Sequence, residues 1–345
     1  MFRKTESIWQ LMQNLQAHLA SGGNTDTALK ATLKQDLHKK FAEVLKVIHR
    51  DVQKGIYLHE SMKKYPDFFD QTIINIIAVG ELSGQLPTVV EQTIKLLEQR
   101  QKLSQQLLTA TLYPLFILST IGALGLVVTF FVLPKLIPLF SSLEVSLPFS
   151  TRLLLGIAEL ITEHPLSLVA FGIFVFFAIA KFVTSVKLKT FRDKLIIRLP
   201  FIGKTIRNSI ILNQLHDLVT LIRSNVDLYS AVVSVTKTTN NTGYYNVLKK
   251  IASNLKAGGT FAQNLNQFPE YYPQAITNII QVGESNGKLM ESLDTTVARL
   301  EQELNNQIKN LTIALEPLLL ILVGLVMLFV AVAITTPIYR LTGNI

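Results

Sequence analysis

Residues 68–86 read FFDQTIINIIAVGELSGQL, and residues 271–289, which lie 203 positions later, read YYPQAITNIIQVGESNGKL. The same offset, without a gap, aligns further glycines and prolines: Gly55 with Gly258, Pro66 with Pro269, Pro114 with Pro317, and Pro134 with Pro337. An ordered series of matches at one constant offset indicates an internal duplication. The sequence therefore predicts two copies of one unit, at about residues 7–140 and 210–343.

Each copy ends in a long apolar segment. Residues 111–134 contain TLYPLFILSTIGALGLVVTFFVL, which has no charged residue, and residues 311–335 contain LTIALEPLLLILVGLVMLFVAVAI, which has one. A third apolar segment, residues 165–183, lies between the copies and has no counterpart in the repeat. A bilayer core about 30 Å thick needs about 20 helical residues, and core helices of soluble proteins are rarely apolar all round. We therefore expect three transmembrane helices rather than three buried core helices.

Composition and charge support a location in the cell membrane. Of the 345 residues, 49% are hydrophobic and 17% are charged, below the about 25% charge of a typical soluble domain. The net charge is +9, and eight Lys and Arg residues lie between Lys181 and Arg207, against two, Lys135 and Arg152, between the first two spans. Because basic flanks stay on the cytoplasmic side, we expect a cytoplasmic N-terminus, an external C-terminus and contact between the basic run and anionic membrane lipid. The charge therefore does not require a nucleic-acid partner.

The duplication leads to the same topology independently. A unit with one span begins on one side of the membrane and ends on the other, so two tandem units would face opposite sides. The unpaired middle span returns the chain and keeps both polar parts in the cytoplasm. We expect an all-α membrane protein with the following order: cytoplasmic helical bundle 1–110, transmembrane helix 111–134, external loop 135–164, transmembrane helix 165–183, cytoplasmic helical bundle 184–310, transmembrane helix 311–335 and external tail 336–345.

A V-G-E-x-x-G turn recurs in both copies. In the first copy, the isoleucine-rich residues 73–77 belong to a helix predicted to end at Gly80, while Gly84 permits a tight entry into the next helix. Glu81 would then lie near the start of that next helix and favour its positive dipole end. The second copy repeats the pattern with Gly283, Glu284 and Gly287. The turn is interpreted as structural, with contact to a partner protein as the alternative.

Residue patterns for catalysis are missing from the sequence. The chain has no cysteine, its six histidines are scattered without metal-ligand spacing, and it has neither a Walker A nor a G-x-S-x-G motif. We expect no catalytic residue, cofactor or metal. Other charged residues are interpreted as solvated: Asp51, Glu60, Lys63 and Lys64.

One charged residue lies inside a predicted span. Glu316 either snorkels to the membrane surface or makes a hydrogen bond within the membrane. Its partner would be the first span, near the repeat counterpart Tyr113, or an incoming transmembrane helix.

With these residues identified, the chain resembles a known family. The doubled V-G-E-x-x-G-x-L turn, the Tyr113-Pro114 pair in the first span and the Glu316-Pro317 pair in the third are similar to the F-type inner-membrane platform proteins of type II secretion and type IV pilus systems. The turns after Ser21 and Ser224 also resemble that family's pattern, and the resemblance covers nearly the whole chain. The Asn24-Thr25 pair departs from the usual, more apolar pair. The short N-terminal part is more similar to the competence-pilus platform proteins of Gram-positive bacteria.

The resemblance implies a non-enzymatic membrane scaffold. A cytoplasmic hexameric assembly ATPase would dock below it, pilin-like subunits would be extracted from the bilayer above it, and the platform would form a dimer or higher oligomer. The fibre would be a type IV pilus or pseudopilus, with DNA uptake in competence as the first expectation and type II protein secretion as the alternative. From the residues alone, a small transporter, a membrane-bound enzyme and a DNA channel are the rivals. We expect no direct nucleic-acid binding.

Overall fold

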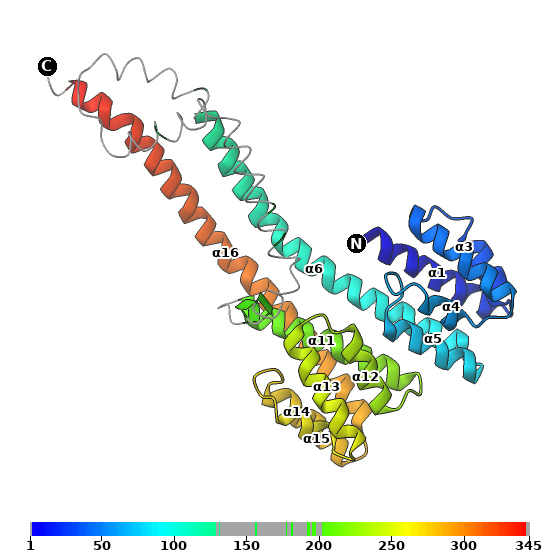
Figure 1. Cartoon of the computed structure of the whole chain (residues 1–345). Helices are drawn as coiled ribbons and strands as arrows, with labels where there is room; N and C mark the ends of the chain where they lie inside the picture. Colours follow the sequence, from blue (N-terminus) through cyan, green and yellow to red (C-terminus); the bar gives the residue numbers. More distant parts are fainter. Residues whose placement is uncertain are drawn as a thin grey trace. The chain divides into compact units, whose positions relative to one another are not determined.

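The computed structural model describes residues 2–128 and 202–342 and, between them, positions 131, 156, 177, 181, 192–193 and 195–197. Over these residues the secondary structure is helical, without a strand, which confirms the predicted all-α class. The described part of each copy contains six helices in the same order (Figure 1).

The helices of the two copies correspond one to one. The first copy contains α1 (Phe2–Ala20), α2 (Thr25–Thr32), α3 (Lys39–Gln53), α4 (Leu58–Lys63), α5 (Gln71–Ser83) and α6 (Leu86–Val127). The second contains α11 (Ile202–Arg223), α12 (Leu228–Thr238), α13 (Thr242–Lys256), α14 (Phe261–Asn266), α15 (Gln274–Ser285) and α16 (Leu289–Thr342). From α2 and α12 onward, each pair of helices starts 203 residues apart, as the sequence offset predicts.

The turn between the first two helices of each copy shows how the repeat maintains its local structure. Gly22 and its counterpart Asn225 both adopt a positive φ, 80° and 61°, which glycine and asparagine tolerate best. Two residues later, the side chains of Asn24 and Asp227 cap the following helices, each accepting a backbone N–H at 2.9 Å. The departure at Asn24 therefore supplies a helix cap.

An aromatic pair is buried in the core of each bundle. In the first bundle, the ring centroids of Phe41 and Phe69 lie 6.0 Å apart. The equivalent residues of the second bundle, Tyr244 and Tyr272, lie 5.8 Å apart. A buried hydroxyl needs a hydrogen-bond partner, and that of Tyr272 donates to Oε1 of Gln214 at 2.8 Å. The second core thus keeps the packing of the first and adds a matched polar pair.

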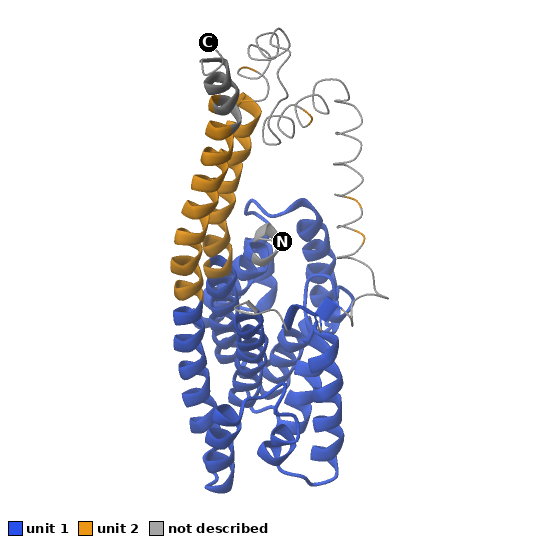
Figure 2. Cartoon of the chain, turned by 90° about the vertical axis from the view of Figure 1, so that its left-hand side faces the viewer, with its two compact units in different colours: residues 1–105, 190–307 blue, residues 106–189, 308–345 orange. Residues whose placement is uncertain are grey.

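The chain divides into two compact units. Unit 1 comprises residues 1–105 and 190–307 and holds both helical bundles. Unit 2 comprises residues 106–189 and 308–345 (Figure 2). The long helices α6 and α16 each contribute their N-terminal part to unit 1 and their C-terminal part to unit 2.

Within the described residues, α6 and α16 are long and apolar enough to cross a membrane. Their most apolar windows have mean hydropathies of 1.8 and 2.7, and almost none of these windows is buried inside the chain. α6 continues through Pro114, and α16 continues through Pro317. The predicted middle span, residues 165–183, lies outside the described residues except at positions 177 and 181. The count of three spans therefore stays a prediction.

Candidate functional site: the glutamate turns and the inter-repeat contact

The first V-G-E turn differs from the prediction in where its helix ends. α5 continues through Gly80 to Ser83, and the break comes at Gly84, whose φ of 71° lies in the left-handed region that favours glycine. Gly80 is buried against α6, where an added Cβ atom would overlap Cγ2 of Val89. The predicted helix end at Gly80 is therefore wrong, because this glycine serves close helix packing and not the turn.

The second copy uses its glycines in the same way. Gly287 follows the end of α15 with a φ of 69°. Gly283 is buried within α15, where an added Cβ atom would overlap Oγ of Ser292. Both V-G-E-x-x-G turns therefore combine one packing glycine with one turn glycine.

Glu81 caps a helix, but not the helix that the sequence indicated. Its Oε1 accepts the backbone N–H of Leu58 at 2.7 Å, and its Oε2 accepts that of His59 at 2.9 Å, at the start of α4. Oε2 also lies 2.6 Å from Nδ1 of His59. Because the N-cap residue Tyr57 makes no side-chain cap, the carboxylate satisfies N–H groups that α4 leaves open. The expectation that Glu81 stabilises the start of α6 is wrong.

Glu284 repeats this geometry in the second copy. Its carboxylate accepts the backbone N–H groups of Phe261 at 2.6 Å and Ala262 at 2.7 Å, at the start of α14. α4 and α14 have six residues each, too few to be stable alone in water. Glu81 therefore fastens α4 to α5, and Glu284 fastens α14 to α15. In each copy the long apolar helix follows directly. A partner contact of these turns stays a proposal.

Asp51 is buried, although the sequence suggested a solvated charge. Its residue is 8% exposed, and its Oδ2 accepts hydrogen bonds from Oγ of Ser61 and Nζ of Lys64, both at 2.7 Å. The hydrogen bonds from Lys64 and Ser61 lower the pKa of the Asp51 carboxyl. The repeat offset was the signal that could have revealed this pair, since it matches Asp51 and Ser61 to Asn254 and Asn264, which are also polar. The side chains of Asn254 and Asn264 are hydrogen-bonded to each other at 2.7 Å.

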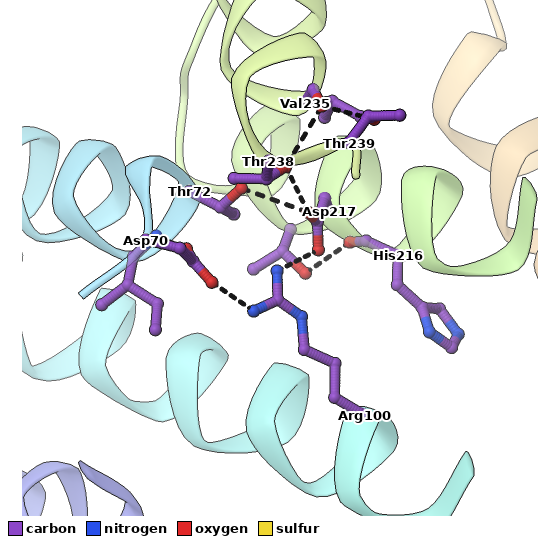
Figure 3. Close-up of polar contacts among 10 residues, drawn as sticks. Asp70, Thr72, Arg100, His216, Asp217, Val235, Thr238 and Thr239 are labelled. Carbon is purple, nitrogen blue, oxygen red and sulfur yellow. Dashed lines mark hydrogen bonds and ion pairs between the residues drawn. The ribbon is translucent and has the colours of Figure 1, made fainter. Parts of the chain in front are cut away.

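Asp217 of α11 accepts three side-chain hydrogen bonds (Figure 3). Its Oδ1 accepts from Nη2 of Arg100 at 2.6 Å, and its Oδ2 accepts from the hydroxyls of Thr72 and Thr238, both at 3.2 Å. Nη1 of Arg100 donates to Oδ2 of Asp70 at 2.5 Å. We call these five residues the Asp217 cluster. Three of them belong to the first copy and two to the second, so the cluster joins the copies within unit 1.

Burial and charge pairing oppose each other in the Asp217 cluster. The Asp217 side chain is 6% exposed, and burial raises the pKa of its carboxyl, opposed by Arg100 and reinforced by Asp70. Burial lowers the pKa of Arg100, but the two carboxylates outweigh it, so the net shift is upward and the guanidinium stays charged. The repeat offset pairs Arg100 with Glu303 and Asp217 with Asn14. Comparing the copies therefore gave no signal for this cluster.

Further contacts join α5 and α6 to α11 and α12. Nδ2 of Asn75 donates to Oγ of Ser234, and Oγ of Ser224 donates to Oε1 of Gln92. Ile76 of α5 and Leu96 of α6 are also buried, but they lie outside the core of the first bundle. We call this face-to-face packing, together with the Asp217 cluster, the inter-repeat contact.

The candidate residues in the apolar segments lie in unit 2. Tyr113 in α6 is 40% exposed, and Glu316 in α16 is also exposed. The hydrogen bonds and ion pairs found among the described residues include none between these two side chains. Both alternatives for Glu316, snorkelling and a contact within the membrane, therefore stay predictions. Also among the described residues, no three His, Asp or Glu side chains are placed to hold a metal ion.

A family comparison matches both copies of the repeat. The model of the family described as Type II secretion system (T2SS), protein F, matches residues 11–134 and again residues 215–337. These ranges cover most of the chain and are related by the repeat offset to within one residue. The chain belongs to this family.

Members of the protein F family from pilus and secretion systems resemble the chain over most of its length. The chain is 25% identical over 337 residues to the type IV pilus assembly protein PilC of Thermus thermophilus, covering 96% of this chain and 82% of the relative. It is 27% identical over 324 residues to the type II secretion system protein F of Pseudomonas aeruginosa, covering 92% of this chain and 78% of the relative. As a protein F family member with two apolar helices, the chain is an inner-membrane protein of the pilus and secretion platform type.

Proposed function

We propose that the chain is the membrane platform on which a cytoplasmic hexameric ATPase drives insertion of pilin-like subunits into a type IV pilus or pseudopilus. The observation that carries this proposal is the continuity of α6 and α16 from paired helical bundles into exposed apolar segments. A partner that shifts the bundles would thereby shift the membrane helices.

The dimensions of these helices support such coupling. α6 has 42 residues and α16 has 54, so at about 1.5 Å per residue they measure roughly 63 and 81 Å. Within unit 1, the buried Asp217 cluster ties the N-terminal part of α6 to α11 and α12. A bundle pair held together in this way responds to a load as one body, which is what a force-transmitting platform requires.

The force itself comes from a partner in this proposal. The sequence has no Walker A motif, and its histidines have no metal-ligand spacing. The chain therefore acts as a non-enzymatic scaffold, and purified protein alone hydrolyses no ATP. The duplicated bundles offer the ATPase two similar docking surfaces, with the V-G-E turns around Glu81 and Glu284 as candidate contacts.

The proposed topology has three spans. The N-terminus and both bundles lie in the cytoplasm, residues 165–183 form the middle span, and the C-terminus lies outside. The basic run after Lys181 contacts anionic lipid, and no direct nucleic-acid binding is involved. Pilin-like subunits meet the apolar segments of α6 and α16, where Glu316 and Tyr113 are candidate contacts with an incoming helix.

The cargo of the fibre is the finer part of the proposal. Assembly of a pilus for DNA uptake in competence is the first candidate, supported by the similarity to a type IV pilus assembly protein. A platform for type II protein secretion is the second, supported by the similarity to a type II secretion system protein F. Deletion of the gene separates them by three readouts: surface fibres, uptake of labelled DNA and protein in the culture medium.

A matched pair of variants tests the coupling. Lys102→Gly with Ser104→Gly softens α6 just before unit 2, since each glycine costs about 1 kcal/mol of helix stability. Lys102→Ala with Ser104→Ala changes the same exposed positions and keeps the helix stiff. We expect both proteins in the membrane at equal amounts, with fibre assembly lost only for the glycine pair. Normal fibres from the deletion strain, or from the glycine pair, would contradict the proposal.

A further inference from the structure

The inter-repeat contact is made by two different surfaces. The first copy contributes α5 and α6, whereas the second contributes α11 and α12, which correspond to α1 and α2 of the first. A contact between unlike surfaces leaves one of each kind unused. Among the described residues, the surfaces left without such a contact are α15 with the start of α16 in the second copy, and α1 with α2 in the first.

The unused surface of the second copy is an open groove. It has a volume of about 470 Å³ and is lined by residues of α15, the turn after it and the start of α16, among them Asn278, Ile279, Val282 and Thr295. We call it the α15 groove. These residues are the counterparts of Asn75, Ile76, Val79 and Gln92 in the inter-repeat contact.

Burial differs between the two equivalent surfaces. Ile76 on α5, the helix that packs against α11 and α12, is fully buried, whereas Ile279 is only half-buried. Val79 is half-buried, whereas Val282 is 62% exposed. The sequence N-I-I-x-V-G is the same on both helices, although among the described residues the contacts between the copies involve α5 and not α15. The α15 groove thus retains the apolar and amide side chains of a contact that this chain leaves open.

The unused surface of the first copy shows the complementary difference. Residues His216, Thr220 and Ser224 follow one another at four-residue steps on α11 and are 3%, 8% and 3% exposed. Their counterparts on and just after α1 are all exposed: Gln13, Ala17 and Ser21. We call this stripe the α1 face. The exposed α1 face therefore corresponds to a buried stripe of the second copy, in which Ser224 contacts Gln92 of the first copy and His216 contacts Glu301 of α16.

We propose that the α1 face of a second copy of this chain occupies the α15 groove and repeats between chains the helix packing of the inter-repeat contact, without the Asp217 cluster. This inference rests on the platform function proposed above and names the surfaces through which copies of the platform join. In the inferred contact, Ser21 approaches Thr295 as Ser224 approaches Gln92 within the chain.

The symmetry of the contact determines the assembly. A head-to-tail contact closes into a ring when its rotation closes, and otherwise extends as a filament. Chains that share one membrane share one direction for the rotation axis, which favours a closed ring. In that ring, bundles of the first copy alternate with bundles of the second copy. Neighbouring bundles meet through the inter-repeat contact within a chain and through the inferred contact between chains.

Cysteine crosslinking tests the contact in the native membrane. Since the chain has no cysteine, introduced pairs are the only thiols. One tagged chain carries Ser21→Cys, and a second, differently tagged chain carries Thr295→Cys. Mild oxidation of membranes that contain both should give a disulfide-linked heterodimer at twice the 38.6 kDa chain mass. A single chain with both substitutions should give a ladder of bands that ends at the ring size.

Matched controls define the outcome. Gln92→Cys with Ser224→Cys should form a bridge within one chain, because these side chains are already hydrogen-bonded, and so reports that oxidation and folding are intact. Val282→Asp should abolish the heterodimer band, whereas Leu82→Asp, at an apolar residue of α5 that is 70% exposed, should leave it unchanged.

Three results would overturn the inference. One is a disulfide within the chain between the cysteines at positions 92 and 224, but no heterodimer from the cysteines at positions 21 and 295. The second is a homodimer of chains carrying Thr295→Cys alone, which would mean that two α15 grooves face each other. The third is a heterodimer that survives Val282→Asp. Fibre assembly is scored in the same strain, so a strain with fibres but no heterodimer rejects the inferred contact and leaves the proposed function standing.

Discussion

Removal of the Glu284 carboxylate should release α14 from α15. Glu284→Ala deletes the acceptor of two backbone hydrogen bonds, to Phe261 and Ala262. A hydrogen bond to a charged group contributes about 1.5–3 kcal/mol, and interaction with the helix dipole adds about 0.3–1 kcal/mol. Water can solvate the freed N–H groups, because this site is only partly buried. We therefore expect a local loss of about 2–4 kcal/mol.

Amide hydrogen exchange of the full-length protein in detergent measures this loss. Since about 1.4 kcal/mol is a factor of ten in an equilibrium constant, exchange in residues 261–266 should accelerate roughly 30-fold to 700-fold. Exchange in α11 should change little. Glu291→Ala is the matched control, because Glu291 is exposed and its ion pair with Lys288, at 3.2 Å, lies at the surface. Equal exchange of residues 261–266 in the two variants would refute the capping role.

Three further predictions concern buried groups. Asp51→Asn should reduce the loss of stability in acid. The hydrogen bond from Lys64 lowers the pKa of Asp51 in the folded protein. The contribution of Asp51 to folding stability is therefore present above the unfolded pKa of 3.8 and is lost as the pH falls through the lower folded pKa. Denaturant unfolding at pH 7 and pH 3 checks this, and an unchanged acid slope would contradict it. Gly80→Ala should destabilise the first bundle by about 1–3 kcal/mol through overlap with Val89, with Gly80→Ala plus Val89→Ala partly restoring it in the same assay. Arg100→Met should lower the stability of the folded protein by about 3–5 kcal/mol because Asp217 is left buried without its cation, and the added change Asp217→Asn should recover part of that loss. Thermal aggregation of membranes containing each variant ranks their stabilities. Equal aggregation temperatures for the variants would argue against a buried ion pair.

The main architecture followed from local sequence patterns. The duplication, the helical class and the apolar segments of α6 and α16 depend on residue spacing and composition along continuous stretches of sequence. Helical periodicity and an apolar segment can both be recognised within a few helical turns. The turn glycines Gly84 and Gly287 were also identifiable, because φ values near +70° favour one residue type. The end of α5 was misplaced at Gly80 because a packing glycine and a terminal glycine look alike in sequence.

The partners of the polar side chains were decided by tertiary structure. Glu81 binds N–H groups 22 and 23 residues before it, Asp51 is buried by residues of the next helix, and Arg100 reaches an aspartate 117 residues away. The repeat offset matched Asp51 to a second polar pair, but it could not reveal the Asp217 cluster, whose members differ between the copies. Side-chain identity shows that a charge needs a partner, whereas the packing of whole helices determines which partner comes within 3 Å.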